Sequence, residues 1–257
     1  MTDILAELLS LSQTWLAAGI AVFLRVGACF VVLPGLGERM IPVRVRLGAA
    51  LAFTAIVTPA VLPLMPDGGA TLPPMRFFMT EAIAGLIMGL ALRLTVHALQ
   101  IAGSIAAQST SLSMIMGGAS PDPQPAMAAL LVLAGVTLAV MAGLHVHLAY
   151  AVLQSYDVLP LGRLPDPGDL GGWGIDLVAA SFRLALSLSA PFLLASLLYN
   201  VALGVINKAM PQLMVAFVGA PAITWGGLFL LLVTTPFLLP AWFAVFEAVL
   251  ADPFGAR

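Results

Sequence analysis

One uncharged stretch decides the fold: residues 184–207 read LALSLSAPFLLASLLYNVALGVIN. The hydrocarbon core of a bilayer is about 30 Å thick and is crossed by about 20 apolar residues in an α-helix, which this stretch exceeds. Five other apolar stretches of similar or greater length lie at 11–34, 47–66, 77–104, 123–156 and 209–246. The sequence therefore predicts six hydrophobic elements that insert into a membrane.

The composition also indicates an all-α integral membrane protein. Hydrophobic residues make up 61% of the chain and charged residues 9%, whereas a soluble domain carries about 25% charged residues. The apolar runs are continuous and lack the alternation of apolar and polar residues that is typical of membrane β-barrels. The longest hydrophilic loop, 157–176, is rich in Pro and Gly. We therefore expect residues 1–257 to form a single integral-membrane domain.

The last apolar stretch, 209–246, is too long for one straight span. It contains Pro221, Pro236 and Pro240, and proline removes a helical hydrogen bond and bends or breaks a helix. A kinked helix or a helical hairpin is expected here.

The distribution of basic residues predicts the topology. Arg39, Arg44, Arg46 and Lys208 gather on one side of the predicted spans, while the loop 157–176 on the other side has four aspartates against one arginine. Cytoplasmic loops carry an excess of Lys and Arg. Both termini are therefore expected outside, with the loop around Arg44 in the cytoplasm.

Several classes of function are disfavoured by what the sequence contains. The net charge of -2 gives no basic excess for nucleic acid. The single cysteine, Cys29, forms no intramolecular disulfide or thiolate cluster, and His145 and His147 point to different faces of a helix. A G-x-S-x-G nucleophile elbow is missing from the sequence. We expect no catalytic residue, metal or cofactor, and no enzyme activity.

Four charged residues fall inside apolar elements: Arg25, Glu81, Arg93 and Arg183. Charges inside a membrane are costly and usually face a protein interior or a water-filled path. They could line a pore, form structural ion pairs, or snorkel to the interface. Glu81 and Arg93 are about 18 Å apart along one helix and cannot pair with each other. Their partners are expected elsewhere, on another element of this chain or on another subunit.

Gly85 and Gly89 are four residues apart in the apolar element 77–104. Small residues at this spacing let the backbones of membrane helices approach closely. This pair predicts a packing contact between helices.

The stretch 108–123, QSTSLSMIMGGASPDP, interrupts the apolar pattern with small, polar and methionine residues. Irregular backbone at membrane depth is tolerated where it is buried in protein or lines a cavity, and methionine makes adaptable contacts. The stretch could be a closing element of a conduit or a plain surface turn. The candidate gating residues are Ser111, Leu112, Ser113, Met114, Ile115, Met116, Gly117, Gly118 and Asp122.

The order of these unusual residues resembles the FliR/SctT family of the type III secretion export gate. Residues 23–27, FLRVG, and 41–47, IPVRVRL, are similar to the family's first helix and its I-P-x-R-x-R-L turn. Gln108, residues 111–114 and the later Asp122 and Pro123 resemble its G-L-S-M segment and downstream D-P, with Ser111 in place of the usual glycine.

Two later motifs carry the same resemblance. Gly143 and His145, followed by residues 155–160, SYDVLP, resemble the family's G-H and S-F-x-x-L-P stretch. Residues 207–213, NKAMPQL, resemble its N-R-x-x-P-Q-L segment, with Lys208 in place of the usual Arg, and Gly219 and Pro221 follow.

This resemblance implies a structural and gating subunit of the bacterial inner membrane, in a flagellar basal body or an equivalent secretion base. It implies FliP-like and FliQ-like subunits and other export-apparatus membrane proteins as partners, around a conduit for unfolded export substrates. It implies that residues 111–122 close the conduit. Assembly contacts are expected at Arg25, Glu81, Arg93, Arg183, Lys208 and Gln212.

A secondary transporter or small-solute channel is the alternative, because such proteins also have broken helices and intramembrane charges. A transporter should have a substrate site at the midplane and an inverted repeat, and the sequence shows neither.

Overall fold

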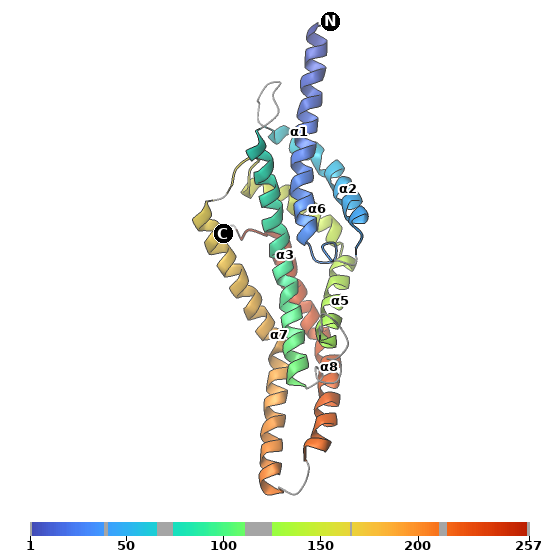
Figure 1. Cartoon of the computed structure of the whole chain (residues 1–257), viewed down its shortest axis with the longest axis vertical. Coiled ribbons are helices and arrows are strands. Elements are labelled where there is room, and N and C mark those ends of the chain that lie inside the picture. Colours follow the sequence, from blue (N-terminus) through green and yellow to red (C-terminus); the bar gives the residue numbers. More distant parts are fainter. Residues whose placement is uncertain are drawn as a thin grey trace. The chain divides into compact units, whose positions relative to one another are not determined.

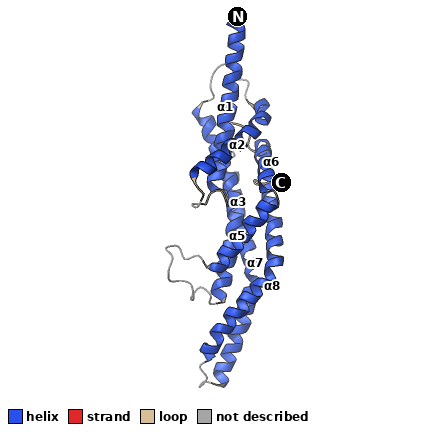
Figure 2. Ribbon diagram, turned by 90° about the vertical axis from the view of Figure 1, so that its right-hand side faces the viewer, coloured by secondary structure: helices blue, strands red, loops and turns tan. Residues whose placement is uncertain are grey.

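The computed structural model of the protein describes residues 2–38, 41–65, 74–110, 125–164, 166–210 and 215–255. Every secondary-structure element in these residues is helical (Figure 2). In chain order the helices are α1 (Thr2–Val32), α2 (Val43–Val61), the 3₁₀ turn η1 (Leu62–Leu64), α3 (Met75–Ser109), α5 (Ala126–Met141), α6 (Leu144–Val158), α7 (Pro167–Ala209) and α8 (Val215–Ala251). The prediction of an all-α fold is confirmed.

Within the described residues, five helices are long and apolar enough to cross a membrane, or six if α5 and α6 count as one interrupted span. The hydroxyl groups in these helices bond to the preceding turn: Thr54 Oγ1 donates to the Ala50 carbonyl oxygen at 2.7 Å, and Thr58 Oγ1 donates to that of Thr54. Such bonds satisfy a hydroxyl group where no water is present. The number of candidate spans, five or six, agrees with the six hydrophobic elements predicted from the sequence.

The stretch predicted as one element over 123–156 is two helices. Helix α5 ends at Met141 and α6 begins at Leu144. Gly143, between them, has φ +85°, a left-handed conformation that ends helices and that glycine adopts without a Cβ clash.

The hydrophilic loop predicted over 157–176 is shorter than expected, because α7 already begins at Pro167. Asp166 Oδ1 accepts a hydrogen bond from the Gly168 backbone N–H at 2.8 Å. Asp before the first turn and Pro at its first position are a helix start signal. The sequence analysis interprets the Pro and Gly content of this segment as a loop and therefore misses the start of the helix.

The last stretch forms one helix, α8, with Pro221, Pro236 and Pro240 inside it. The helical-hairpin alternative is therefore wrong. The hydroxyl groups of Thr234 and Thr235 donate to the carbonyl oxygens of Leu230 and Leu231.

The chain divides into two compact units, each built from separate segments. Unit 1 contains residues 1–94, 142–177 and 247–257, and unit 2 contains residues 95–141 and 178–246. In unit 1, α2 packs against α1 and α6 (Figure 1), and the rings of Phe30 and Phe53 meet edge to face with centroids 5.0 Å apart. The expectation of a single membrane domain stays a prediction.

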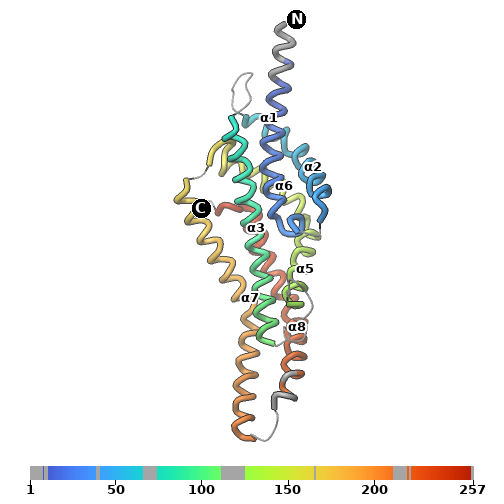
Figure 3. Tube along the Cα trace, viewed as in Figure 1, coloured from blue at the N-terminus to red at the C-terminus, as the bar shows by residue number. Residues whose placement is uncertain are grey.

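Unit 2 is built from the second half of α3, from α5, and from most of α7 and α8. Its apolar cluster contains Ala106, Ala107, Met127 and Phe192. The Trp242 side chain is fully buried, and its Nε1–H donates to the Thr95 carbonyl oxygen at 2.8 Å. Helices α7 and α8 lie side by side (Figure 3).

Candidate functional site

A buried ion pair in unit 1 joins α1 to α3. Arg25 Nε donates to Glu81 Oε2 at 2.9 Å, and the two side chains are 1% and 0% exposed. Both residues lie on apolar helix faces. On α1, the residues Ala18, Val22 and Cys29 are fully buried and share one face of the helix with Arg25, because they follow one another at intervals of three and four residues. A charge inside a membrane is costly unless it is paired, so each of the two charges lowers the free-energy cost of burying the other.

The remaining arms of the guanidinium group bind the end of α6. Arg25 Nη1 donates to Ser155 Oγ at 2.9 Å, and Nη2 donates to the Leu159 carbonyl oxygen at 2.8 Å. The guanidinium carbon lies 3.7 Å from the centroid of the Tyr156 ring, a cation–π contact. A single arginine therefore joins α1 to α3 and to the C-terminal turn of α6.

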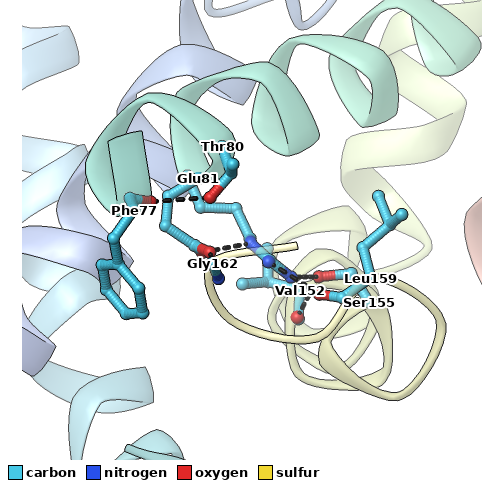
Figure 4. Close-up of polar contacts among 8 residues, drawn as sticks. Phe77, Thr80, Glu81, Val152, Ser155, Leu159 and Gly162 are labelled. Carbon is cyan, nitrogen blue, oxygen red and sulfur yellow. Dashed lines mark hydrogen bonds and ion pairs between the residues drawn. The ribbon is translucent and has the colours of Figure 1, made fainter. Parts of the chain in front are cut away.

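The second carboxylate oxygen of Glu81 holds the turn that follows α6. Glu81 Oε1 accepts a hydrogen bond from the Gly162 backbone N–H at 3.1 Å (Figure 4). Gly162 has φ +72°, and a Cβ on it would lie within 3.0 Å of the Phe77 ring. This position requires glycine both for its backbone conformation and for space. We call Arg25, Glu81, Ser155, Leu159 and Gly162 the Arg25 network.

Two glycines bring α3 close enough for this network to form. A Cβ on Gly85 would lie within 3.0 Å of the Arg25 carbonyl oxygen, and one on Gly89 would lie 2.7 Å from the Cys29 carbonyl oxygen. The helix packing predicted from this glycine pair is confirmed. Gly85 is one turn after Glu81, so the close approach of the helices also places the Glu81 carboxylate beside the Arg25 guanidinium group.

The Arg25 network is a structural clamp. Both carboxylate oxygens and all three guanidinium nitrogens of the pair have protein partners. Such saturated charges hold helices together, and breaking a buried pair is strongly destabilising. Among the described residues, no group of three or more His, Cys, Asp or Glu side chains could hold a metal ion.

The network corrects one expectation from the sequence. The partner of Glu81 was expected on another element, and the structure places it there, on α1. Arg25 and Glu81 were also expected to form pairs with other subunits, but they pair with each other inside the chain. The alternative of a structural ion pair is the one that the structure supports. The sequence does not show which distant helices meet, so the pairing partner could not be read from it.

The other predicted residues lie apart from this network. Arg93 is half-buried, and its Nη1 donates to the Val32 carbonyl oxygen at 3.3 Å. Arg183 and Lys208 are exposed on α7. Gln212 and the candidate gating residues Ser111 to Gly118 and Asp122 lie outside the described residues.

Sequence reasoning missed the contacts of Ser155, Leu159 and Gly162 with the pair. The first two belong to the S-Y-x-x-L-P motif, and their role becomes visible only when Arg25 is placed beside them. A second missed contact lies in the I-P-x-R-x-R-L turn, where Arg46 Nε donates to the Leu36 carbonyl oxygen at 2.9 Å. That arginine ties the start of α2 to the residues that follow α1.

Comparison with known families assigns the chain. Residues 16–249 match the family described as bacterial export proteins, family 1. The chain belongs to this family. The match includes the whole Arg25 network and all or most of each candidate membrane span in the described residues.

Three curated relatives are similar over most of their length. The flagellar biosynthetic protein FliR of Caulobacter vibrioides is 33% identical over 234 residues, which are 90% of this chain and 92% of that protein. The protein of the same name from Escherichia coli K12 is 26% identical, covering 88% of this chain and 87% of its own length. That of Bacillus subtilis is 26% identical over 79% of this chain and 80% of its own.

These matches confirm the resemblance to the FliR family and the expected membership of the export apparatus. This member of bacterial export proteins, family 1, is a non-enzymatic component of the type III export apparatus in the bacterial inner membrane.

Proposed function

We propose that this chain is a structural and gating subunit of the flagellar protein export gate, which forms the conduit for unfolded substrates together with FliP-like and FliQ-like subunits. The observation that carries the proposal is the family match over residues 16–249, combined with relatives that are all flagellar biosynthetic proteins.

The exposed apolar surface of α7 and α8 supports partner binding. Many large apolar side chains on these two helices are exposed in the single chain, among them Leu197, Leu198, Trp225, Phe229 and Phe237. Such a surface needs lipid or another helical membrane protein as its neighbour. We propose that part of it packs against the FliP-like and FliQ-like subunits, and that Arg93, Arg183, Lys208 and Gln212 contact those or other export-apparatus membrane proteins.

The proposed assembly is tested by co-expressing the chain with FliP-like and FliQ-like proteins and purifying it in mild detergent. The mass of the intact particle and the identity of its subunits are then determined. We expect one large assembly that contains both partners. A monomer or simple homodimer would contradict the proposed assembly with these partners.

The proposed gating segment is residues 111–122. Its small and methionine-containing sequence suits reversible contact with the walls of a conduit. Deleting residues 112–118 should leave the complex intact but make membranes that contain it permeable to small ions. Unchanged permeability of a normally assembled complex would contradict the gating role.

A further inference from the structure

Two prolines on the exposed face of α8 each leave a backbone carbonyl oxygen without its helical donor. Proline has no backbone N–H, so Pro236 cannot bond to the Leu232 carbonyl oxygen, and Pro240 cannot bond to that of Pro236. Leu232, Pro236 and Pro240 are spaced by four residues and are all exposed in the single chain. The two carbonyl oxygens therefore belong to one exposed face of the helix.

Groups within α8 do not replace the missing donors. Thr234 and Thr235 directly precede the first proline, but each hydroxyl group donates to the carbonyl oxygen four residues before it, at 2.7 and 2.6 Å. The helix keeps its α geometry past both prolines, so no local 3₁₀ or π turn brings another N–H to either oxygen. An unsatisfied backbone group is costly in hydrocarbon, and a neighbouring helix is one of the few structures that can satisfy it.

The surroundings of these oxygens indicate a protein side chain as the donor. The candidate span in α8 is Pro221–Ala251, and Leu232 and Pro236 lie near its middle, where acyl chains offer no hydrogen-bond donor and water is absent. The exposed side chains around them include Phe229 and Phe237. Large apolar side chains of this kind do not suit a water-filled path. A neighbour that satisfies the oxygens therefore has to carry its own N–H or O–H group.

A second feature of the same face fits a helix and not acyl chains. Ala222 and Gly226 are four residues apart and exposed, and a Cβ on Gly226 would meet nothing within 4 Å. Small residues at this spacing let another helix approach closely. Phe229, Pro236 and Pro240 follow Ala222 by about two, four and five helical turns, so they share its face. The small pair and the two carbonyl oxygens are thus presented to the same neighbour.

We propose that this face of α8 binds a membrane-spanning helix of a partner subunit. The partner helix packs closely against Ala222 and Gly226, and one of its polar side chains donates a hydrogen bond to the Leu232 or the Pro236 carbonyl oxygen. This inference rests on the proposed assembly with FliP-like and FliQ-like subunits and adds to it the chemistry of one contact.

Returning the missing donor to the chain tests the hydrogen bond. Pro236→Ala supplies an N–H to the Leu232 carbonyl oxygen and so removes an acceptor from the partner. We expect a higher midpoint of thermal unfolding for the chain alone in mild detergent, because alanine is the better helix former. The yield of the complex with FliP-like and FliQ-like subunits should nevertheless fall several-fold. A proline that only stabilised the chain itself would change both quantities in the same direction.

Pro221→Ala is the matched control on the same helix. Pro221 is exposed and is the first residue of the candidate span, so the carbonyl oxygen four residues before it lies outside the span, where water can donate. We expect Pro221→Ala to leave the yield of the complex unchanged. Equal yields for wild type, Pro236→Ala and Pro221→Ala would overturn the inference.

Gly226→Leu tests the close approach of the partner without changing any backbone donor. Its Cβ begins in open space within the chain, and leucine is a better helix former than glycine, so the unfolding midpoint of the chain alone should not fall. The yield of the complex should fall several-fold, because the larger side chain keeps the partner helix away. A wild-type yield for Gly226→Leu would contradict the proposed packing on this face, whatever the result for Pro236→Ala.

Photo-crosslinking identifies the neighbour directly. With p-benzoylphenylalanine in place of Phe229, irradiation of the purified complex should give a covalent product that contains a partner subunit. A product with lipid alone, from a complex that assembles normally, would mean that lipid covers this face; the proposed assembly would then stand and this inference would fail. If the wild-type chain forms no complex with these subunits, the proposed function itself fails, and the inference fails with it.

Discussion

Arg25 and Glu81 are 56 positions apart and form a 2.9 Å ion pair that is closed to solvent on both sides. The pair also fixes a backbone turn, since Arg25 binds the Leu159 carbonyl oxygen and Glu81 binds the Gly162 N–H. The turn from α6 toward α7 is thus held by charged groups that come from α1 and α3. Loss of either charge should therefore loosen both the contact between α1 and α3 and this turn.

Glu81→Gln should strongly destabilise the protein, because Arg25 is left buried without a counter-charge. Breaking a buried pair by removing one partner costs about 3 to 5 kcal/mol. Glu247→Gln is the matched control, since Glu247 is exposed on α8 and exposed substitutions usually stay within about 0.5 kcal/mol. The midpoint of thermal unfolding in mild detergent measures both. Equal midpoints for the two variants would show that the pair contributes little.

Gly85→Ala should destabilise the protein even though alanine is the better helix former. The gain in helix propensity is about 1 kcal/mol, but the new methyl group would lie within 3.0 Å of the Arg25 carbonyl oxygen, and overpacking costs about 1 to 3 kcal/mol. In α2, a Cβ on Gly48 meets nothing within 4 Å. Gly48→Ala should therefore raise the unfolding midpoint, and Gly85→Ala should lower it. If the unfolding midpoint rose for both variants, α1 and α3 would be less closely packed than the structure shows.

The sequence predicts the helical fold well because its signal is local. Long uncharged runs such as 184–207 have to form helices in a membrane, since unpaired backbone groups are too costly there. The glycine pair Gly85 and Gly89 predicts close packing for the same reason, because the spacing of small residues is visible in one helix. A local pattern also marks the start of α7, where Asp166 precedes Pro167, although the segment was predicted as part of a loop.

The candidate site is less predictable because it depends on contacts between distant segments. The sequence marks Arg25 and Glu81 as unusual, but not that the two meet. Ser155 and Gly162 are ordinary residues until the pair lies beside them. Distances of this kind depend on tertiary packing, which hydrophobicity in lipid does not specify.

Gly162→Ala should destabilise the protein more than Gly143→Ala. Both glycines have positive φ, +72° and +85°, so both substitutions bring backbone strain of about 1 to 2 kcal/mol. A Cβ on Gly143 meets nothing within 4 Å, whereas one on Gly162 meets the Phe77 ring. The displaced turn would also weaken the hydrogen bond from the Gly162 N–H to Glu81. The midpoints of thermal unfolding of the two variants test this order. Equal decreases in the midpoint would show that backbone strain alone accounts for the loss of stability.

Trp242→Phe should destabilise unit 2 by about 1 kcal/mol or more, because the Thr95 carbonyl oxygen loses the bond from Trp242 Nε1 while it stays buried. The smaller ring also leaves space beside Gly135, where the indole now packs. Trp225→Phe is the matched control, since Trp225 is 74% exposed on the same helix. Thermal unfolding in detergent should separate the variants, with a lower midpoint for Trp242→Phe alone. If Trp225→Phe were the more damaging change, the buried contact would not be the one that stabilises α8 against α3.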